Sequence, residues 1–154
     1  MFGLGYSRYM PGTVASFVTS FIYIILFILK VNIIPLLFFV SSILVYSIFI
    51  IDSFSNNFKD IDSKEIVIDE FIGQSIPILS IYFVLPKENP GEFIFLTFLA
   101  FILFRIFDIF KPYPINQIDK YMKNGFGVVF DDVMAGTISS IIILIIIFNF
   151  TNGL

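Results

Sequence analysis

Three charged residues recur at three-residue intervals within an apolar stretch of the chain. Residues 104–115 read FRIFDIFKPYPI, so that Arg105, Asp108 and Lys111 are surrounded mainly by phenylalanine and isoleucine. On a helix, this spacing lets either cation pair with Asp108 in an internal salt bridge. The two cations could also serve a phosphate, which arginine binds through two donors at once. The residues alone leave both interpretations open.

Two pairs of adjacent acids lie in similarly apolar surroundings. Asp69-Glu70 stands in the stretch IVIDEFIGQ, and Asp131-Asp132 stands in VVFDDVMAG. Aligned on these acids, both stretches read apolar, Asp, acid, apolar, apolar, small, variable, Ser or Thr, Ile, which suggests a short internal repeat. A helix N-terminus would explain one carboxylate in each pair, because its free N–H groups and dipole favour negative charge. The second carboxylate of each pair needs another explanation.

Two helices that brought these four carboxylates together would need a cation between them. Oxygen ligands suit Mg²⁺ best, with Ca²⁺ or Mn²⁺ as alternatives. Small side chains at Gly73, Ala135 and Gly136 would let the two helices approach closely. The segment NGFG at residues 124–127 is expected to add backbone N–H groups just before a helix start, where phosphate often binds. The sequence therefore predicts a divalent cation beside a phosphate.

The composition excludes several kinds of catalysis. The chain has no cysteine, which removes disulfides and thiolate chemistry, and no histidine, which removes imidazole bases, His-ligated zinc and phosphohistidine intermediates. Any catalysis must use carboxylates, lysine, arginine, hydroxyls, the backbone or a metal ion. No basic run suggests nucleic-acid binding, and nothing indicates an oligomeric state.

The composition also indicates an integral membrane protein. Of 154 residues, 58% are hydrophobic and only 14% are charged, and apolar runs near membrane-spanning length recur along the chain. We expect an all-α helical bundle with about five hydrophobic helical segments, forming one membrane-embedded domain over residues 1–154. These runs cover residues 14–29, 33–51, 66–85, 92–110 and 128–148.

The segments between the runs set their ends. The first run makes only about 24 Å of helix, so whether it fully crosses a membrane stays open. The polar stretch 52–65 is expected to be a solvated loop, and PKENPG at residues 86–91 a turn. Pro112 should end the fourth run, because the residue before a proline is kept out of helical geometry.

The distribution of basic residues predicts an orientation. If five crossings alternate, one side receives six basic residues and the other receives two. The positive-inside rule then places the N-terminus in the cytoplasm and the C-terminus outside. Both acid pairs and the charges of residues 104–115 fall at this cytoplasmic face. The six are Arg8, Lys59, Lys64, Lys111, Lys120 and Lys123, and the two are Lys30 and Lys87.

Four blocks of the chain resemble the signature blocks of the phosphatidylglycerophosphatase A family. They are PGTVAS (residues 11–16), IDEFIGQ (68–74), FRIFDIFKPYPI (104–115) and FGVVFDDVMAG (126–136). They occur in the family's order and with similar spacing, over about residues 9–140. The chain departs from the family at Ala15, where glycine is usual.

The resemblance implies a membrane-embedded, Mg²⁺-dependent lipid phosphatase of a bacterial cell membrane. It would remove the terminal phosphate of phosphatidylglycerophosphate, a phospholipid in the bilayer, and leave phosphatidylglycerol. We expect four carboxylates to hold one or two Mg²⁺ ions, and Arg105 and Lys111 to neutralise the transferred phosphate. Asp108 would complete the metal site, orient Arg105 or relay a proton. The four expected metal ligands are Asp69, Glu70, Asp131 and Asp132.

Three other kinds of protein fit the pattern less well. A cation or proton transporter would also carry carboxylates in membrane segments, but usually near the membrane midplane, where these five runs lack charge. A CDP-alcohol phosphotransferase would carry a spaced acidic motif that this chain lacks. A non-catalytic membrane scaffold would not explain why two pairs of acids lie in apolar segments.

Overall fold

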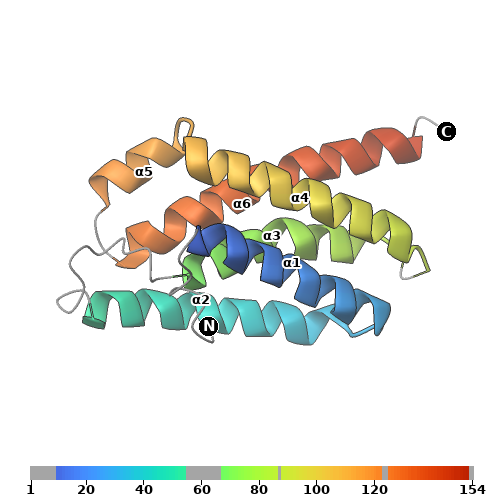
Figure 1. Cartoon of the computed structure of the whole chain (residues 1–154), viewed down its shortest axis with the longest axis horizontal. Coiled ribbons are helices and arrows are strands. Elements are labelled where there is room, and N and C mark those ends of the chain that lie inside the picture. The colour runs from blue at the N-terminus through green and yellow to red at the C-terminus, as the bar shows by residue number, and fades with distance from the viewer. Residues whose placement is uncertain (1–9, 55–66, 87, 123–124, 153–154) are drawn as a thin grey trace.

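The structure is a computed structural model that describes residues 10–54, 67–86, 88–122 and 125–152, and these parts of the chain form a bundle of helices (Figure 1). This arrangement confirms the predicted all-α fold. The polar stretch 52–65 lies mostly outside the described residues, although a helix continues through its first three positions. The described parts contain six helices: α1 (Pro11–Ile28), α2 (Ile33–Phe54), α3 (Ile68–Val84), α4 (Pro90–Phe110), α5 (Ile115–Tyr121) and α6 (Gly125–Asn152).

Among the helices that the structure describes, four are long and apolar enough to cross a membrane, namely α1, α2, α4 and most of α6. The helix α3 is shorter, at 17 residues, and carries Asp69 and Glu70 in its first turn. It packs against α1, α2, α4 and α6, and most of its side chains are buried. The central helix of the bundle therefore carries two acids near its first turn.

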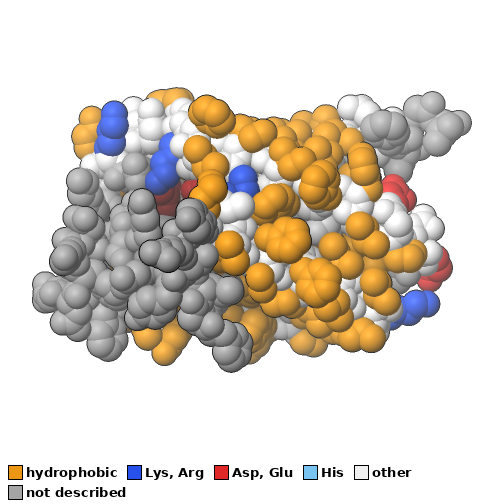
Figure 2. All heavy atoms as spheres, in the orientation of Figure 1, with side chains coloured by type: hydrophobic (Ala, Val, Ile, Leu, Met, Phe, Trp, Pro, Cys, Tyr) orange, Lys and Arg blue, Asp and Glu red, His pale blue; other side chains and the backbone are white. Residues whose placement is uncertain are grey.

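The outer surface of the bundle is apolar. Large hydrophobic side chains such as Phe38 and Phe49 of α2 and Phe95 of α4 are exposed. Figure 2 shows hydrophobic side chains over most of the surface between the two ends of the molecule, while charged side chains gather toward the ends. A surface of this kind suits contact with the hydrocarbon of a bilayer.

The helix directions bring the polar motifs to one end of the bundle. The N-terminal ends of α1, α3 and α6 and the C-terminal ends of α2 and α4 all lie at the end where α5 is found (Figure 1). α4 ends at Phe110, as Pro112 predicts. Lys111 then takes a left-handed conformation (φ 40°), rather than the extended one that precedes most prolines.

α3 and α6 are in backbone contact, and glycines make this possible. A Cβ atom at Gly136 would overlap the carbonyl oxygen of Gly73, and one at Gly73 would overlap the carbonyl oxygen of Asp132 and the ring of Phe104. Ala135 is fully buried beside them. The predicted role of small residues between these two helices is confirmed, and it sets the distance between the two acid pairs.

Several helix boundaries differ from prediction by one to four residues, and the starts of α6 and α1 are the ones that concern the polar motifs. α6 begins at Gly125, three residues before the predicted run. Gly125 to Gly127 therefore belong to the helix and do not precede it, and residue 124 lies outside the described residues. α1 begins at Pro11, also three residues early, because proline is well suited to the first position of a helix.

Candidate active site

Three carboxylates from two helices meet at the α5 end of the bundle. Asp69, Glu70 and Asp132 each place one carboxylate oxygen within 4.8 Å of the others. Asp69 and Asp132 are buried, with 7% and 5% of their surfaces exposed. The Oε2 atom of Glu70 is also buried and has no hydrogen-bond partner among the described residues.

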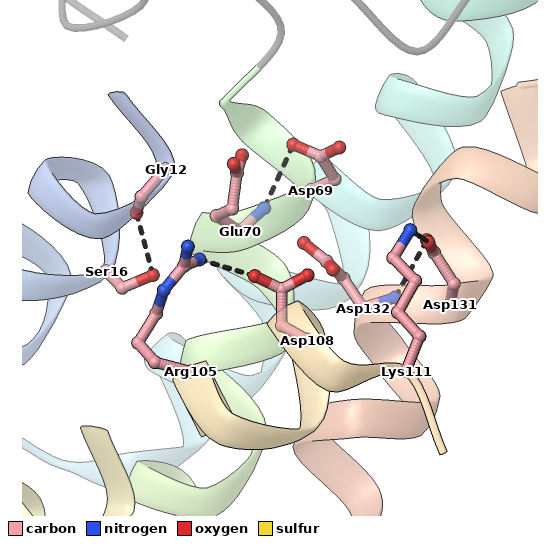
Figure 3. Close-up of polar contacts among 9 residues, drawn as sticks. All are labelled: Gly12, Ser16, Asp69, Glu70, Arg105, Asp108, Lys111, Asp131 and Asp132. Carbon is pink, nitrogen blue, oxygen red and sulfur yellow. Dashed lines mark hydrogen bonds and ion pairs between the residues drawn. The ribbon is translucent and has the colours of Figure 1, made fainter. Parts of the chain in front are cut away.

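The fourth predicted ligand, Asp131, is placed differently. Its Oδ2 atom lies 2.6 Å from the Nζ atom of Lys111, which follows the end of α4 (Figure 3). Its Oδ1 atom accepts a hydrogen bond from the backbone N–H of Asp132 at 3.0 Å. The structure thus groups Asp132 with the α3 acids and pairs Asp131 with a lysine.

The internal repeat extends to side-chain geometry. Asp69 accepts a hydrogen bond from the N–H of Glu70 at 3.0 Å, as Asp131 does from Asp132. The first acid of each pair therefore binds the equivalent backbone N–H, although Asp69 also belongs to the shared cluster and Asp131 does not. A helix start accounts for the acids of α3, which lie in its first turn, but the acids of α6 come six and seven residues after its first residue.

Arg105 and Asp108 form the internal salt bridge that their spacing allows. The Nη1 atom of Arg105 lies 2.5 Å from Oδ2 of Asp108, and both side chains are mostly buried. The Nε atom of Arg105 has no hydrogen-bond partner in the described part of the chain. One edge of the guanidinium therefore holds Asp108, while the Nε group is left for another acceptor.

The first turn of α1 closes the site on the side of Glu70. A Cβ atom at Gly12 would overlap Oε1 of Glu70 and lie 3.3 Å from Nη1 of Arg105, so a larger residue there would displace the Glu70 carboxylate (Figure 3). The Oγ1 atom of the next residue, Thr13, is buried without a partner among the described residues. Gly12 and Thr13 were not predicted as site residues, although the block PGTVAS that contains them was part of the resemblance.

The charges of this cluster do not balance among the described residues. It holds five carboxylates and two cations, an excess of three negative charges if all are ionised. At separations up to 4.8 Å, two ionised carboxylates repel by about 3.5 kcal/mol or more for an effective dielectric constant of about 20. A bound divalent cation would offset this repulsion, and oxygen atoms from three carboxylates fit Mg²⁺. The excess charge and the unpartnered Glu70 oxygen both fit a metal site.

Comparison with known proteins decides the family. The model of the phosphatidylglycerophosphatase A family, PgpA, matches residues 1–147 of the chain. The chain belongs to the PgpA family. The predicted resemblance is confirmed, and PgpA membership supports a phosphatase.

A similar protein carries a related name. A protein of Bacteroides thetaiotaomicron, provisionally named a phosphatidylinositol-3-phosphatase, is 33% identical over 147 residues, which cover 94% of this chain and 87% of that protein. No solved structure matches the chain. Both similarities point to phosphatase chemistry, while the two names give different lipids.

Proposed function

We propose that this PgpA-family protein hydrolyses the terminal phosphomonoester of phosphatidylglycerophosphate and releases phosphatidylglycerol and inorganic phosphate. The observation that carries the proposal is the meeting of Asp69, Glu70 and Asp132 beside Arg105 at one end of an apolar bundle. The family match supports the choice of lipid. Acyl chains in the bilayer would leave the head group at the level of this end.

The metal ligands in this proposal are Asp69, Glu70 and Asp132, with Mg²⁺ as the cation. When bound, the cation supplies Lewis-acid polarisation of the phosphate and lowers the pKa of the attacking water. Asp131, the fourth ligand expected from the sequence, serves in our proposal as the partner of Lys111. Its ion pair at 2.6 Å supports this assignment.

Arg105 and Lys111 bring positive charge to the phosphate. The unpartnered Nε group of Arg105 donates to a phosphate oxygen, and Asp108 keeps the guanidinium oriented through its ion pair. Negative charge that develops on the transferred group is stabilised by both cations. The chain has no histidine to act as a base, and we assign the proton of the attacking water to the carboxylate of Asp108. The bond from phosphorus to the glycerol oxygen breaks, and that oxygen takes up a proton.

We place the site at the cytoplasmic face of a bacterial cell membrane. The support is the uneven distribution of basic residues, six on one side and two on the other. Lys111 and Lys120 lie at the site end of the bundle and Lys30 at the opposite end, whereas the other five lie outside the described residues.

The name of the Bacteroides protein suggests a second candidate substrate for this chain. This candidate is phosphatidylinositol 3-phosphate, which is also a phosphomonoester on a membrane lipid. The same three carboxylates and Arg105 would serve either head group, so the two candidates differ in substrate and not in mechanism.

The test measures release of inorganic phosphate by the purified protein in detergent, from each of the two lipids, with Mg²⁺ and with a chelator. We expect Mg²⁺-dependent release that is faster from phosphatidylglycerophosphate. Faster release from the inositol lipid would favour the second substrate. Release that is equally fast with the chelator would contradict the metal assignment, and no release from either lipid would contradict the proposed function.

A further inference from the structure

The side chain of Gln74 is buried in the bundle without hydrogen-bond partners. Its exposed fraction is 0%, and neither its Oε1 nor its Nε2 atom has a partner among the described residues. Buried serines of the same bundle behave differently. Ser16, Ser75 and Ser139 each donate to a carbonyl four residues earlier, at 2.9, 2.6 and 2.8 Å. The Gln74 amide thus carries an unmet donor and an unmet acceptor in a place where each costs free energy.

Gln74 lies about one helical turn beyond Glu70 of the candidate active site, on the same helix. It follows Glu70 by four residues, so the two side chains share one face of α3 and are about 6 Å apart along the helix axis. Side chains of a helix lean toward its N-terminus, so the amide lies over the turn that begins at Glu70. Glu70 itself lies against Gly12 and Arg105. The face of α3 that carries Glu70 and Gln74 therefore lies toward α1 and α4, and these three helices pack in pairs.

The chemistry of the amide indicates what it would bind. A phosphate ester oxygen without a proton only accepts hydrogen bonds, and a metal ion would use only the carbonyl oxygen. A hydroxyl group both donates and accepts, so it matches the unmet Nε2 and Oε1 atoms together. In the lipid of the proposed function, the carbon next to the one that bears the terminal phosphate ester carries such a hydroxyl.

We propose that Gln74 hydrogen-bonds this head-group hydroxyl and selects phospholipids whose phosphate lies beside a hydroxyl-bearing carbon. The proposal rests on the proposed function and adds a determinant of specificity to it. Phosphatidic acid carries its phosphate directly on diacylglycerol and has no such hydroxyl. In the same site it would leave the buried amide unpaired, and sites built for a substrate hydroxyl discriminate strongly against analogues that lack it.

The test compares Gln74→Met with the wild type on phosphatidylglycerophosphate and on phosphatidic acid. Methionine keeps the length of the side chain and removes both hydrogen-bonding atoms. We expect kcat/KM on phosphatidylglycerophosphate to fall roughly 10- to 100-fold, while the slower hydrolysis of phosphatidic acid stays unchanged, so that the preference between the lipids collapses. The melting temperature in detergent should stay the same or rise, because an unsatisfied buried amide is removed.

Gln117→Met is the matched control, since Gln117 is exposed on α5 and the chemical change is the same. This variant should keep the wild-type preference. An equal loss on both lipids with a lower melting temperature would show that Gln74 has a structural role and would overturn the inference. An unchanged preference in Gln74→Met would overturn it as well. A wild-type protein that hydrolysed neither lipid would contradict the proposed function, and the inference with it.

Discussion

The guanidinium of Arg105 could serve either an ion pair with Asp108 or the binding of the substrate phosphate. Asp108 holds its Nη1 atom, while its Nε atom is buried without a partner in the described part of the chain. Because Gly12 has no side chain, the Glu70 carboxylate can lie beside Gly12, close to the guanidinium of Arg105. A salt bridge alone would need only the positive charge, whereas phosphate binding also needs the planar arrangement of donors. A substitution that keeps the positive charge but removes the planar guanidinium therefore distinguishes the two roles.

The variant Arg105→Lys tests whether Arg105 binds the phosphate or only pairs with Asp108. If Arg105 grips the phosphate, kcat/KM should fall roughly 10- to 1,000-fold, a loss of about 1.4 to 4 kcal/mol of transition-state stabilisation. The melting temperature in detergent should barely move, because lysine can still pair with Asp108. The opposite pattern, with normal turnover in Arg105→Lys and mainly a lower melting temperature in Asp108→Asn, would make the pair structural.

The two adjacent aspartates of α6 should also behave differently. Asp132 lies in the carboxylate group and Asp131 pairs with Lys111, so only Asp132→Asn should remove the response to Mg²⁺. In the wild type, Mg²⁺ at about 100 times its Kd should add about 2.7 kcal/mol of stability, seen as a higher melting temperature. Asp132→Asn should lose this gain and turnover, while Asp131→Asn should keep most of the gain.

Glu92→Gln provides the control for this pair of variants, because it makes a carboxamide at an exposed position in the first turn of α4, away from the site. It should match the wild type in both measurements. A full Mg²⁺ response in Asp132→Asn would show that Asp132 is not a ligand.

At the scale of elements, the contact between α3 and α6 determines where the acids lie. The backbones touch at Gly73 and Gly136, one turn below Glu70 and Asp132. Since neither glycine can gain a Cβ atom without a clash against backbone, a larger residue at either position would force the two helices apart. The distance between the acid pairs is therefore a property of this helix contact.

Gly136→Ala tests this dependence. The new Cβ atom would overlap the carbonyl oxygen of Gly73, so α3 and α6 must move apart, at a cost of about 1–3 kcal/mol. Both the melting temperature and Mg²⁺-dependent turnover should fall, because Asp132 moves away from Asp69 and Glu70. Gly91→Ala in α4 meets nothing within 4 Å and should leave turnover intact while the helix gains slightly in stability. Equal behaviour of the two variants would contradict the role of the contact.

The positions of the helices could largely be predicted from the sequence, because long apolar runs and proline set their extents. The end of α4 just before Pro112 could be predicted in this way. The close contact at Gly136 could be predicted from the small size of this residue. The partner of Asp131 could not be predicted, since adjacent acids look alike in sequence and only the packing of α4 against α6 brings Lys111 to one of them. The contact of Gly12 with Glu70 likewise depends on how α1 packs.

At the scale of the whole molecule, the two ends of the bundle differ in kind. The α5 end carries the carboxylates and their cations, whereas the opposite end is held by aromatic packing. There the ring of Phe27 stacks on Phe93 at 3.8 Å, and Tyr82 packs edge-on against both. The Tyr82 hydroxyl lies 3.1 and 2.7 Å from the carbonyl oxygens of Leu26 and Val31, at the turn between α1 and α2. Chemistry and structural support thus occupy opposite ends, and the orientation of the bundle decides which compartment meets the site.

This orientation can be measured with single cysteines, because the chain has none of its own. Gln117 on α5 marks the site end, and Asn89, before α4, marks the opposite end; both are exposed. If the site faces the cytoplasm, a membrane-impermeant thiol reagent added to intact cells should label Asn89→Cys and leave Gln117→Cys unlabelled. Permeabilised cells should show labelling of both, which establishes that Gln117→Cys is reachable once the membrane is open. Labelling of Gln117→Cys alone in intact cells would place the carboxylates at the outer face, and the substrate would then have to be dephosphorylated in the outer leaflet.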